Sequence, residues 1–100
     1  MSSTVIPTEQ EIATRVRAVL HDLFGDALHS VADDTELTTA LGERYDSLAA
    51  MECVSRVEGE FGIEVDFVAD DVRFSFATLG RIGAFVRDRL EDHAILGNTL

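Results

Sequence analysis

Apolar residues recur at helical spacing in three separate stretches of this chain, and this pattern is the strongest constraint on its fold. Within each stretch the apolar positions repeat about every 3.6 residues, which places them on one face of an α-helix. The stripes are Ile12-Val16-Val19-Leu20-Leu23, Ala50-Val54-Val57-Phe61 and Leu79-Ile82-Phe85-Val86-Leu90. The sequence therefore predicts three main helices that bury their stripes against one another.

The first stripe predicts a helix that begins at Thr8 and ends before Gly25. Thr8 and Glu11 form a capping-box pattern, and a glycine after the last apolar position is a common helix stop. From Asp26 to Gly42 the period fades, so a long, partly packed loop is expected, and loops of this length often belong to functional surfaces. The residues expected to anchor this loop are Leu28, Val31, Leu37 and Leu41.

The second stripe predicts a helix from about Ser47 to Glu60, with Asp46 placed to cap its first turn. The run Ile63–Val68 alternates apolar and acidic residues, as a strand does. Because a lone strand would have no pairing partner, we expect an extended loop over Ile63–Phe67 whose apolar residues face inward. A short helix is expected over Ala69–Val72.

The third stripe predicts a final helix that starts near Thr78 and frays from Asp92 onward. The expected fold is all-α: a small bundle of three main helices plus one short helix, with a long loop between helices one and two. The expected domain limits are a flexible tail over 1–7, a single domain over 8–92 and a tail over 93–100.

The net charge and the length of the chain limit the classes of function that fit this sequence. Nineteen acidic against eight basic residues give a net charge of −11, which repels nucleic acid and anionic membranes and favours partners with basic docking sites. No apolar run reaches membrane-spanning length, and residues 1–7 do not resemble a secretory signal. Cys53 is the only cysteine, so no intramolecular disulfide can form. These features favour a cytoplasmic, monomeric protein, and the small size favours a binding or carrier role over catalysis.

The start of the second predicted helix carries a specific pattern. The stretch from Tyr45 to Glu52, YDSLAAME, is followed by VEGEFGIEV from Val57 to Val65. Together they resemble the Asp-Ser-Leu motif and recognition helix of acyl carrier proteins, including the spacing from the serine to the Glu-Phe-Gly-Ile run. The resemblance extends over residues 8–92 and includes the Thr-Leu-Gly start of the final helix.

The resemblance implies that Ser47, flanked by Asp46 and Leu48, receives phosphopantetheine from coenzyme A through a phosphopantetheinyl transferase. It also implies that the arm's thiol holds an acyl group as a thioester, supplied by a loading enzyme and used by a downstream synthase or tailoring enzymes. The chain itself would catalyse nothing. A serine in the first helical turn projects from the bundle, beside N–H groups that stabilise a phosphate. The partner face implied comprises Leu48, Met51, Glu52, Ser55, Glu58 and Val65.

Alternatives remain at this point. Ser47 can be an ordinary helix-start residue, Leu48 and Met51 can belong to the core, and the glutamates can simply solvate the helix. The chain can equally be a discrete peptidyl carrier that holds an aminoacyl group, or an unmodified acidic adaptor. The connection Glu43–Tyr45 and Ala49 depart from the usual acyl carrier pattern and favour a specialised pathway, such as polyketide or fatty-acid-like biosynthesis. The group carried is not predicted.

The remaining chemically active residues are expected to be structural. His21, His29 and His93 are separated in sequence and show no short metal-ligand spacing with Cys53, so no metal site is expected. Cys53 is interpreted as a small packing residue on the second helix.

Overall fold

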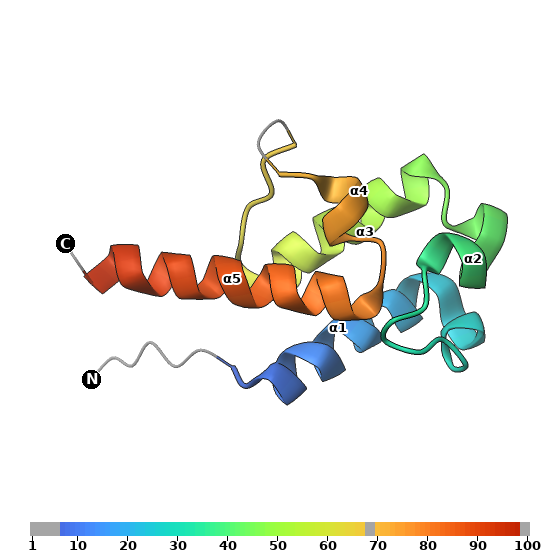
Figure 1. Ribbon diagram of the computed structural model, residues 1–100, viewed down its shortest axis with the longest axis horizontal. Coiled ribbons are helices and arrows are strands. Elements are labelled where there is room, and N and C mark those ends of the chain that lie inside the picture. The colour runs from blue at the N-terminus through green and yellow to red at the C-terminus, as the bar shows by residue number, and fades with distance from the viewer. Residues whose placement is uncertain (1–6, 68–69, 99–100) are drawn as a thin grey trace.

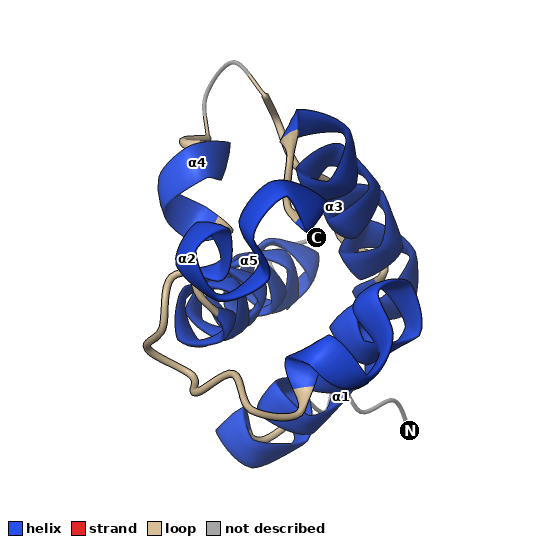
Figure 2. Ribbon diagram, turned by 90° about the vertical axis from the view of Figure 1, so that its right-hand side faces the viewer, coloured by secondary structure: helices blue, strands red, loops and turns tan. Residues whose placement is uncertain are grey.

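The structure is a computed structural model that describes residues 7–67 and 70–98, and within them the chain forms helices, turns and loops without a strand (Figures 1 and 2). The α-helices are α1 (Glu9–Phe24), α2 (Leu37–Leu41), α3 (Ser47–Phe61), α4 (Val72–Ser75) and α5 (Leu79–Asn98), and the 3₁₀ helices are η1 (Gly25–Leu28) and η2 (Gly42–Arg44). The all-α class and the three main helices, α1, α3 and α5, are therefore confirmed.

The core lies where α1 packs against both α3 and α5. The predicted stripes supply most of it, since at least two positions of each stripe are almost completely buried. These positions are Ile12, Val16 and Leu20 on α1, Val54 and Val57 on α3, and Ile82 and Val86 on α5. Ala50 and Phe85 are only partly buried against this core.

The predicted limits of α1 are confirmed by its two ends. At the start, the Thr8 hydroxyl accepts a hydrogen bond from the Glu11 amide at 3.1 Å, and the Glu11 carboxylate accepts one from the Thr8 amide at 2.8 Å. At the end, Gly25 adopts a φ of 67°, which ends the helix in a conformation that favours glycine. The chain therefore turns sharply into η1.

The segment from Asp26 to Gly42 is more ordered than the predicted loop, because it contains part of η1 and all of α2. Its four predicted anchors, Leu28, Val31, Leu37 and Leu41, are all buried, as expected. Two backbone hydrogen bonds of 2.8 Å join it to the start of α5, from the Leu37 amide to the Ala77 carbonyl and from the Gly80 amide to the Asp33 carbonyl. A Cβ atom at position 80 would lie 3.1 Å from the Asp33 oxygen, so glycine permits this close approach.

The segment after α3 departs from the prediction at one residue. Ile63 and Val65 are buried as expected, but the Phe67 side chain is 51% exposed. The Glu58 carboxylate accepts a hydrogen bond from the Val65 amide at 2.7 Å and so fixes this segment against α3. The alternating pattern therefore predicts the inward-facing residues up to Val65 but not Phe67.

The short helix lies later than predicted. α4 spans Val72–Ser75 rather than Ala69–Val72, because the Asp71 carboxylate caps it by accepting from the Phe74 amide. Residue 69, with which the predicted helix begins, lies outside the described residues.

α5 is longer than predicted. The Thr78 hydroxyl accepts from the Arg81 amide at 3.0 Å and caps the start of α5, which continues to Asn98 although fraying was expected from Asp92. No proline or glycine interrupts residues 84–96, and Figure 1 shows this end projecting beyond the bundle. The domain limits remain predictions, and residues 1–6, 99 and 100 lie outside the described residues. Among the helices of residues 7–67 and 70–98, none combines the length and the apolar content of a membrane-spanning helix.

Candidate functional site

Ser47 is the first residue of α3, and its side chain is exposed. The preceding residue caps the helix as predicted: the Asp46 side chain accepts from the Ala49 amide at 2.8 Å, and its carbonyl accepts from the Ala50 amide at 2.9 Å. These bonds hold the first turn in place while the Ser47 hydroxyl faces solvent.

Tyr45 anchors the connection that precedes this serine. Its side chain is 8% exposed, and its hydroxyl donates a hydrogen bond to the Phe76 carbonyl at 2.7 Å. Its ring packs edge-on against Phe24, with the ring centroids 5.8 Å apart. The sequence shows that this connection is long but assigns Tyr45 no role. The only signal is a large aromatic residue within a polar turn.

The Tyr45 hydroxyl lies beside the Cys53 thiol inside the bundle. Burial raises the pKa of Tyr45 well above its ordinary value, and the neighbouring Cys53 raises it further. Burial also raises the pKa of Cys53 to about 12, an effect that the hydrogen bond with Tyr45 partly opposes. Both groups are therefore neutral at physiological pH, and Cys53, which is completely buried, is a packing residue as predicted.

An open groove of about 570 Å³ runs between the start of α3 and α4, and Ser47 lies on its wall. The residues that line it include Arg73, Phe74 and Arg81. Phe74 is 57% exposed, and the Arg81 guanidinium lies over its ring, 4.2 Å from the centroid. The groove therefore combines an aromatic surface and two guanidinium groups with the carboxylates of Glu36, Asp46 and Asp71. The sequence pattern indicates no role for Arg73, Phe74 or Arg81.

The arginines of the groove differ from most others in the chain. All eight basic residues are arginines, and five of them form ion pairs with carboxylates: Arg15 with Glu60, Arg17 with Asp33, Arg56 with Asp22, Arg87 with Glu9 and Glu91, and Arg89 with Asp70. Across residues 7–67 and 70–98, the three arginines outside any ion pair are Arg44, Arg73 and Arg81. Two of these line the groove, and the third lies three residues before Ser47.

The predicted partner face is only partly exposed. Leu48 and Met51 are 80% and 51% exposed, so they lie outside the core, and Glu52 and Ser55 are exposed on the same helix. Val65 is 8% exposed and has almost no side-chain surface for a partner to contact. The half-buried Glu58 is already engaged by the Val65 amide.

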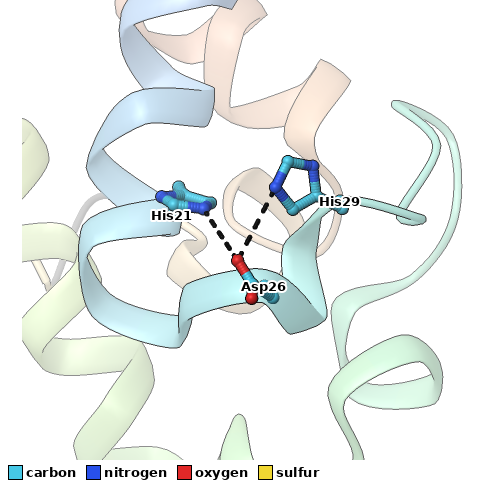
Figure 3. Close-up of side chains that lie close together, drawn as sticks. All are labelled: His21, Asp26 and His29. Carbon is cyan, nitrogen blue, oxygen red and sulfur yellow. Dashed lines mark ion pairs between the residues drawn. The ribbon is translucent and has the colours of Figure 1, made fainter.

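A second group of side chains gathers at the end of α1, where the sequence predicts no metal site. His21, Asp26 and His29 place one donor atom each within 4.8 Å of one another (Figure 3). The sharp turn after α1 brings His21 and His29 together, although they are separated in sequence. The sequence signal for this cluster is its spacing: Asp26 follows His21 by five residues, and His29 follows Asp26 by three. The side chain of His93 lies outside the described residues.

Comparison with protein families identifies the domain. A family model described as a phosphopantetheine attachment site matches residues 14–86. The chain belongs to this family. The match confirms the resemblance to acyl and peptidyl carrier proteins, and it implies a covalently attached phosphopantetheine, a group typically held on a serine. Domains of this family are generally non-catalytic carriers that interact with phosphopantetheinyl transferases and biosynthetic enzymes. No solved structure gives a significant match to the chain.

Proposed function

We propose that this chain is a discrete acyl carrier protein whose phosphopantetheine arm is attached to Ser47. The observation that supports this most directly is the position of Ser47, exposed at the first residue of α3 on the wall of a groove that also carries Arg73 and Arg81. It also lies inside the region that matches the family. The first N–H groups of a helix have no partner within it, which favours an anion at this end.

The residues around Ser47 fit the group. A phosphodiester on Ser47 adds a negative charge next to Asp46, in a chain whose net charge is already −11. Arg73 and Arg81 line the same groove without carboxylate partners among the described residues, so they are placed to offset this charge. When bound, the arm supplies a terminal thiol that holds a substrate as a thioester.

The chain's own residues present and position the attachment point. The Asp46 cap holds the first turn of α3, and the Tyr45–Phe76 hydrogen bond ties the preceding connection to the end of α4. Leu48 and Met51 provide exposed apolar surface close to the serine. A docking enzyme can therefore approach a preformed site with apolar contacts beside it.

Two features favour an acyl over an aminoacyl cargo: the aspartate before Ser47 and the strongly acidic composition. On this proposal the partners are a phosphopantetheinyl transferase, an acyl-loading enzyme and a downstream synthase, each with basic residues at its docking site. The unusual Glu43–Tyr45 connection favours a specialised pathway. We place the protein in the cytoplasm as a monomer. A discrete peptidyl carrier is the second candidate, and aminoacylation of the holo-protein in place of acylation would favour it.

Intact mass tests the attachment site. After incubation with coenzyme A and a broad-specificity phosphopantetheinyl transferase, the wild-type chain should gain the mass of one phosphopantetheine. Ser47→Ala should gain none and stay folded, while Ser30→Ala, which removes an exposed serine elsewhere, should be modified as the wild type is. A wild-type chain that stays unmodified would instead support the acidic adaptor, and a modified Ser47→Ala would place the arm on another residue.

A further inference from the structure

Three side chains converge at the end of α1 on the outside of the bundle (Figure 3). His21 lies in the last turn of α1, Asp26 lies in η1, and His29 follows η1 directly. The Nε2 atoms of both histidines lie 3.7 Å from the same Asp26 oxygen, Oδ1. The two rings meet edge to face, with centroids 5.2 Å apart and an interplanar angle of 80°.

The backbone holds this arrangement. The Gly25 amide donates to the His21 carbonyl as the helix ends, and the positive φ of Gly25 turns the chain back. The His29 amide then donates to the Asp26 carbonyl at 3.0 Å. Buried Leu28 anchors the segment between Asp26 and His29 in the core. The three donors are therefore presented by a short, well-anchored turn.

The donor spacing suits a small divalent cation. Zn²⁺ binds imidazole nitrogen and carboxylate oxygen at about 2.0–2.2 Å in a tetrahedral arrangement, so its ligand atoms lie about 3.3–3.6 Å apart. The two histidine-to-aspartate separations are 3.7 Å, and all three donor atoms lie within 4.8 Å of one another. The side chains are 47%, 72% and 95% exposed in His21, His29 and Asp26, so they can rotate to reach the shorter spacing. Both contacts are ion pairs that are longer than a hydrogen bond.

The charged residues near the cluster are paired with other residues, which leaves the cluster available to bind a cation. Arg17 lines a surface depression together with His21 and His29, but its guanidinium pairs with Asp33 at 2.8 Å. Asp22, next to His21 in sequence, pairs with Arg56. The net charge of −11 favours any cation at the surface. The fully buried Cys53 thiol is not available as a ligand.

We propose that His21, Asp26 and His29 form a surface site for one divalent cation of the imidazole-preferring class, represented by Zn²⁺. Two nitrogen donors select against Mg²⁺ and Ca²⁺, which prefer oxygen ligands. Three protein ligands leave at least one coordination position open to water. A bound cation would link η1 to the end of α1. It would thereby also fix the start of the segment that leads to α2. This site is distinct from Ser47 and does not depend on the proposed carrier function.

Isothermal titration of the tag-free apo-protein with ZnCl₂ tests this site. The wild type should bind one equivalent. His21→Ala, His29→Ala and Asp26→Asn should each weaken binding by about tenfold or more, because loss of a direct ligand costs at least as much affinity as loss of a group that only supports a ligand. Asp34→Asn removes the same charge at an exposed position outside the cluster and should bind as the wild type does. MgCl₂ should give no saturable binding.

NMR spectra of the imidazole protons give a second measurement that does not depend on calorimetry. Addition of Zn²⁺ should shift the resonances of His21 and His29, and His93→Ala should leave these shifts unchanged. Absence of binding would leave the three residues as a solvent-exposed ion-pair group and overturn the site. Equal weakening by Asp34→Asn and Asp26→Asn, or equal binding of Mg²⁺ and Zn²⁺, would show that the cation only responds to the acidic surface and would overturn it as well.

Discussion

Tyr45 is the residue whose role depends most on the tertiary structure. It joins the connection before Ser47 to the end of α4 through a single hydrogen bond to a backbone carbonyl 31 residues away. Because the bond is buried, loss of the hydroxyl leaves the Phe76 carbonyl without this partner in a low-dielectric environment.

Tyr45→Phe should therefore lower the free energy of unfolding by about 1–3 kcal/mol, the range for an unsatisfied buried polar group. Urea unfolding measures this change, and hydrogen exchange of the Ser75 and Phe76 amides should accelerate as α4 loosens. Phe24→Leu, which keeps an apolar side chain in contact with the ring, should leave that exchange less affected. An unchanged exchange rate in Tyr45→Phe would show that the bond does not hold α4.

Cys53 should be chemically silent in the folded chain. Its thiol is completely buried, and burial raises its pKa from an ordinary 9.0 to about 12. The native apo-protein should react with a thiol reagent at pH 8 only after denaturation, because the thiolate is the reactive form. The holo-protein should show one fast-reacting thiol, that of the arm. Fast reaction of native apo-protein would contradict the assignment of Cys53 as a packing residue.

The same shift makes stability depend on alkaline pH. A folded-state pKa above the unfolded value means that, between about pH 9 and 12, the unfolded chain binds fewer protons than the folded chain. The free energy of unfolding should be unaffected by this group below pH 9 and fall as pH rises toward 12. Tyr45, whose pKa is also raised, adds to the fall at the alkaline end.

At the scale of a single element, α3 packs one of its sides into the core and exposes another to solvent. Cys53, Val54 and Val57 face the core, while Leu48 and Met51 are exposed on the other side. Two acidic residues of α3, Glu52 and Glu58, also differ in their surroundings. Glu52 is exposed, but Glu58 binds the Val65 amide and stabilises the segment after the helix. The two glutamates that the sequence groups on one partner face are thus expected to behave differently when mutated.

Substitutions on the exposed side of α3 should affect Ser47 modification in two different ways. Charges at an interface rim act mainly on association rate and are screened by salt, whereas apolar contacts act mainly on dissociation. Glu52→Lys should slow transferase modification chiefly at low ionic strength, and Leu48→Ala should slow it at every ionic strength. Glu64→Lys makes the same charge change after the helix. If it slowed modification as much as Glu52→Lys, net charge rather than Glu52 would control docking.

At the scale of the whole molecule, charge organises both the bundle and its surface. Ion pairs join α1 to α3 through Arg15–Glu60 and Arg56–Asp22, and α1 to α5 through Arg87–Glu9. All are solvent-exposed, and each such pair contributes little to stability because water and salt screen it. The arginines of the groove are not used in this way, which leaves them free to respond to a charge added at Ser47.

Arg73→Gln combined with Arg81→Gln should therefore destabilise the holo-protein more than the apo-protein. The difference should be about 0.5–2 kcal/mol at low salt, from two exposed charge interactions, and should shrink as salt rises. Thermal unfolding of both forms measures it. Arg56→Gln, which breaks the α1–α3 pair instead, should affect the two forms equally. An equal effect of the groove substitutions on both forms would show that these arginines do not contact the phosphodiester.

The sequence alone was sufficient for the three main helices and for the candidate attachment residue. Positions such as Ile12, Val54 and Ile82 repeat with a helical period, and this period depends only on the local backbone geometry. Ser47 was recognisable because its flanking residues, including the Asp46 cap, are contiguous in sequence. Cys53 was correctly assigned to packing from its position on a helix.

The tertiary structure alone decided the features that join distant or sharply turned segments. Nothing in a sequence window shows that the Tyr45 hydroxyl meets the Phe76 carbonyl. His21, Asp26 and His29 are close in sequence, but only the turn at Gly25 brings their donor atoms together. The exposure of Phe67 likewise did not follow from the alternating pattern of its segment. Hydrogen-bonded partners and surface clusters are set by packing between elements, whereas the helical period is set within each element.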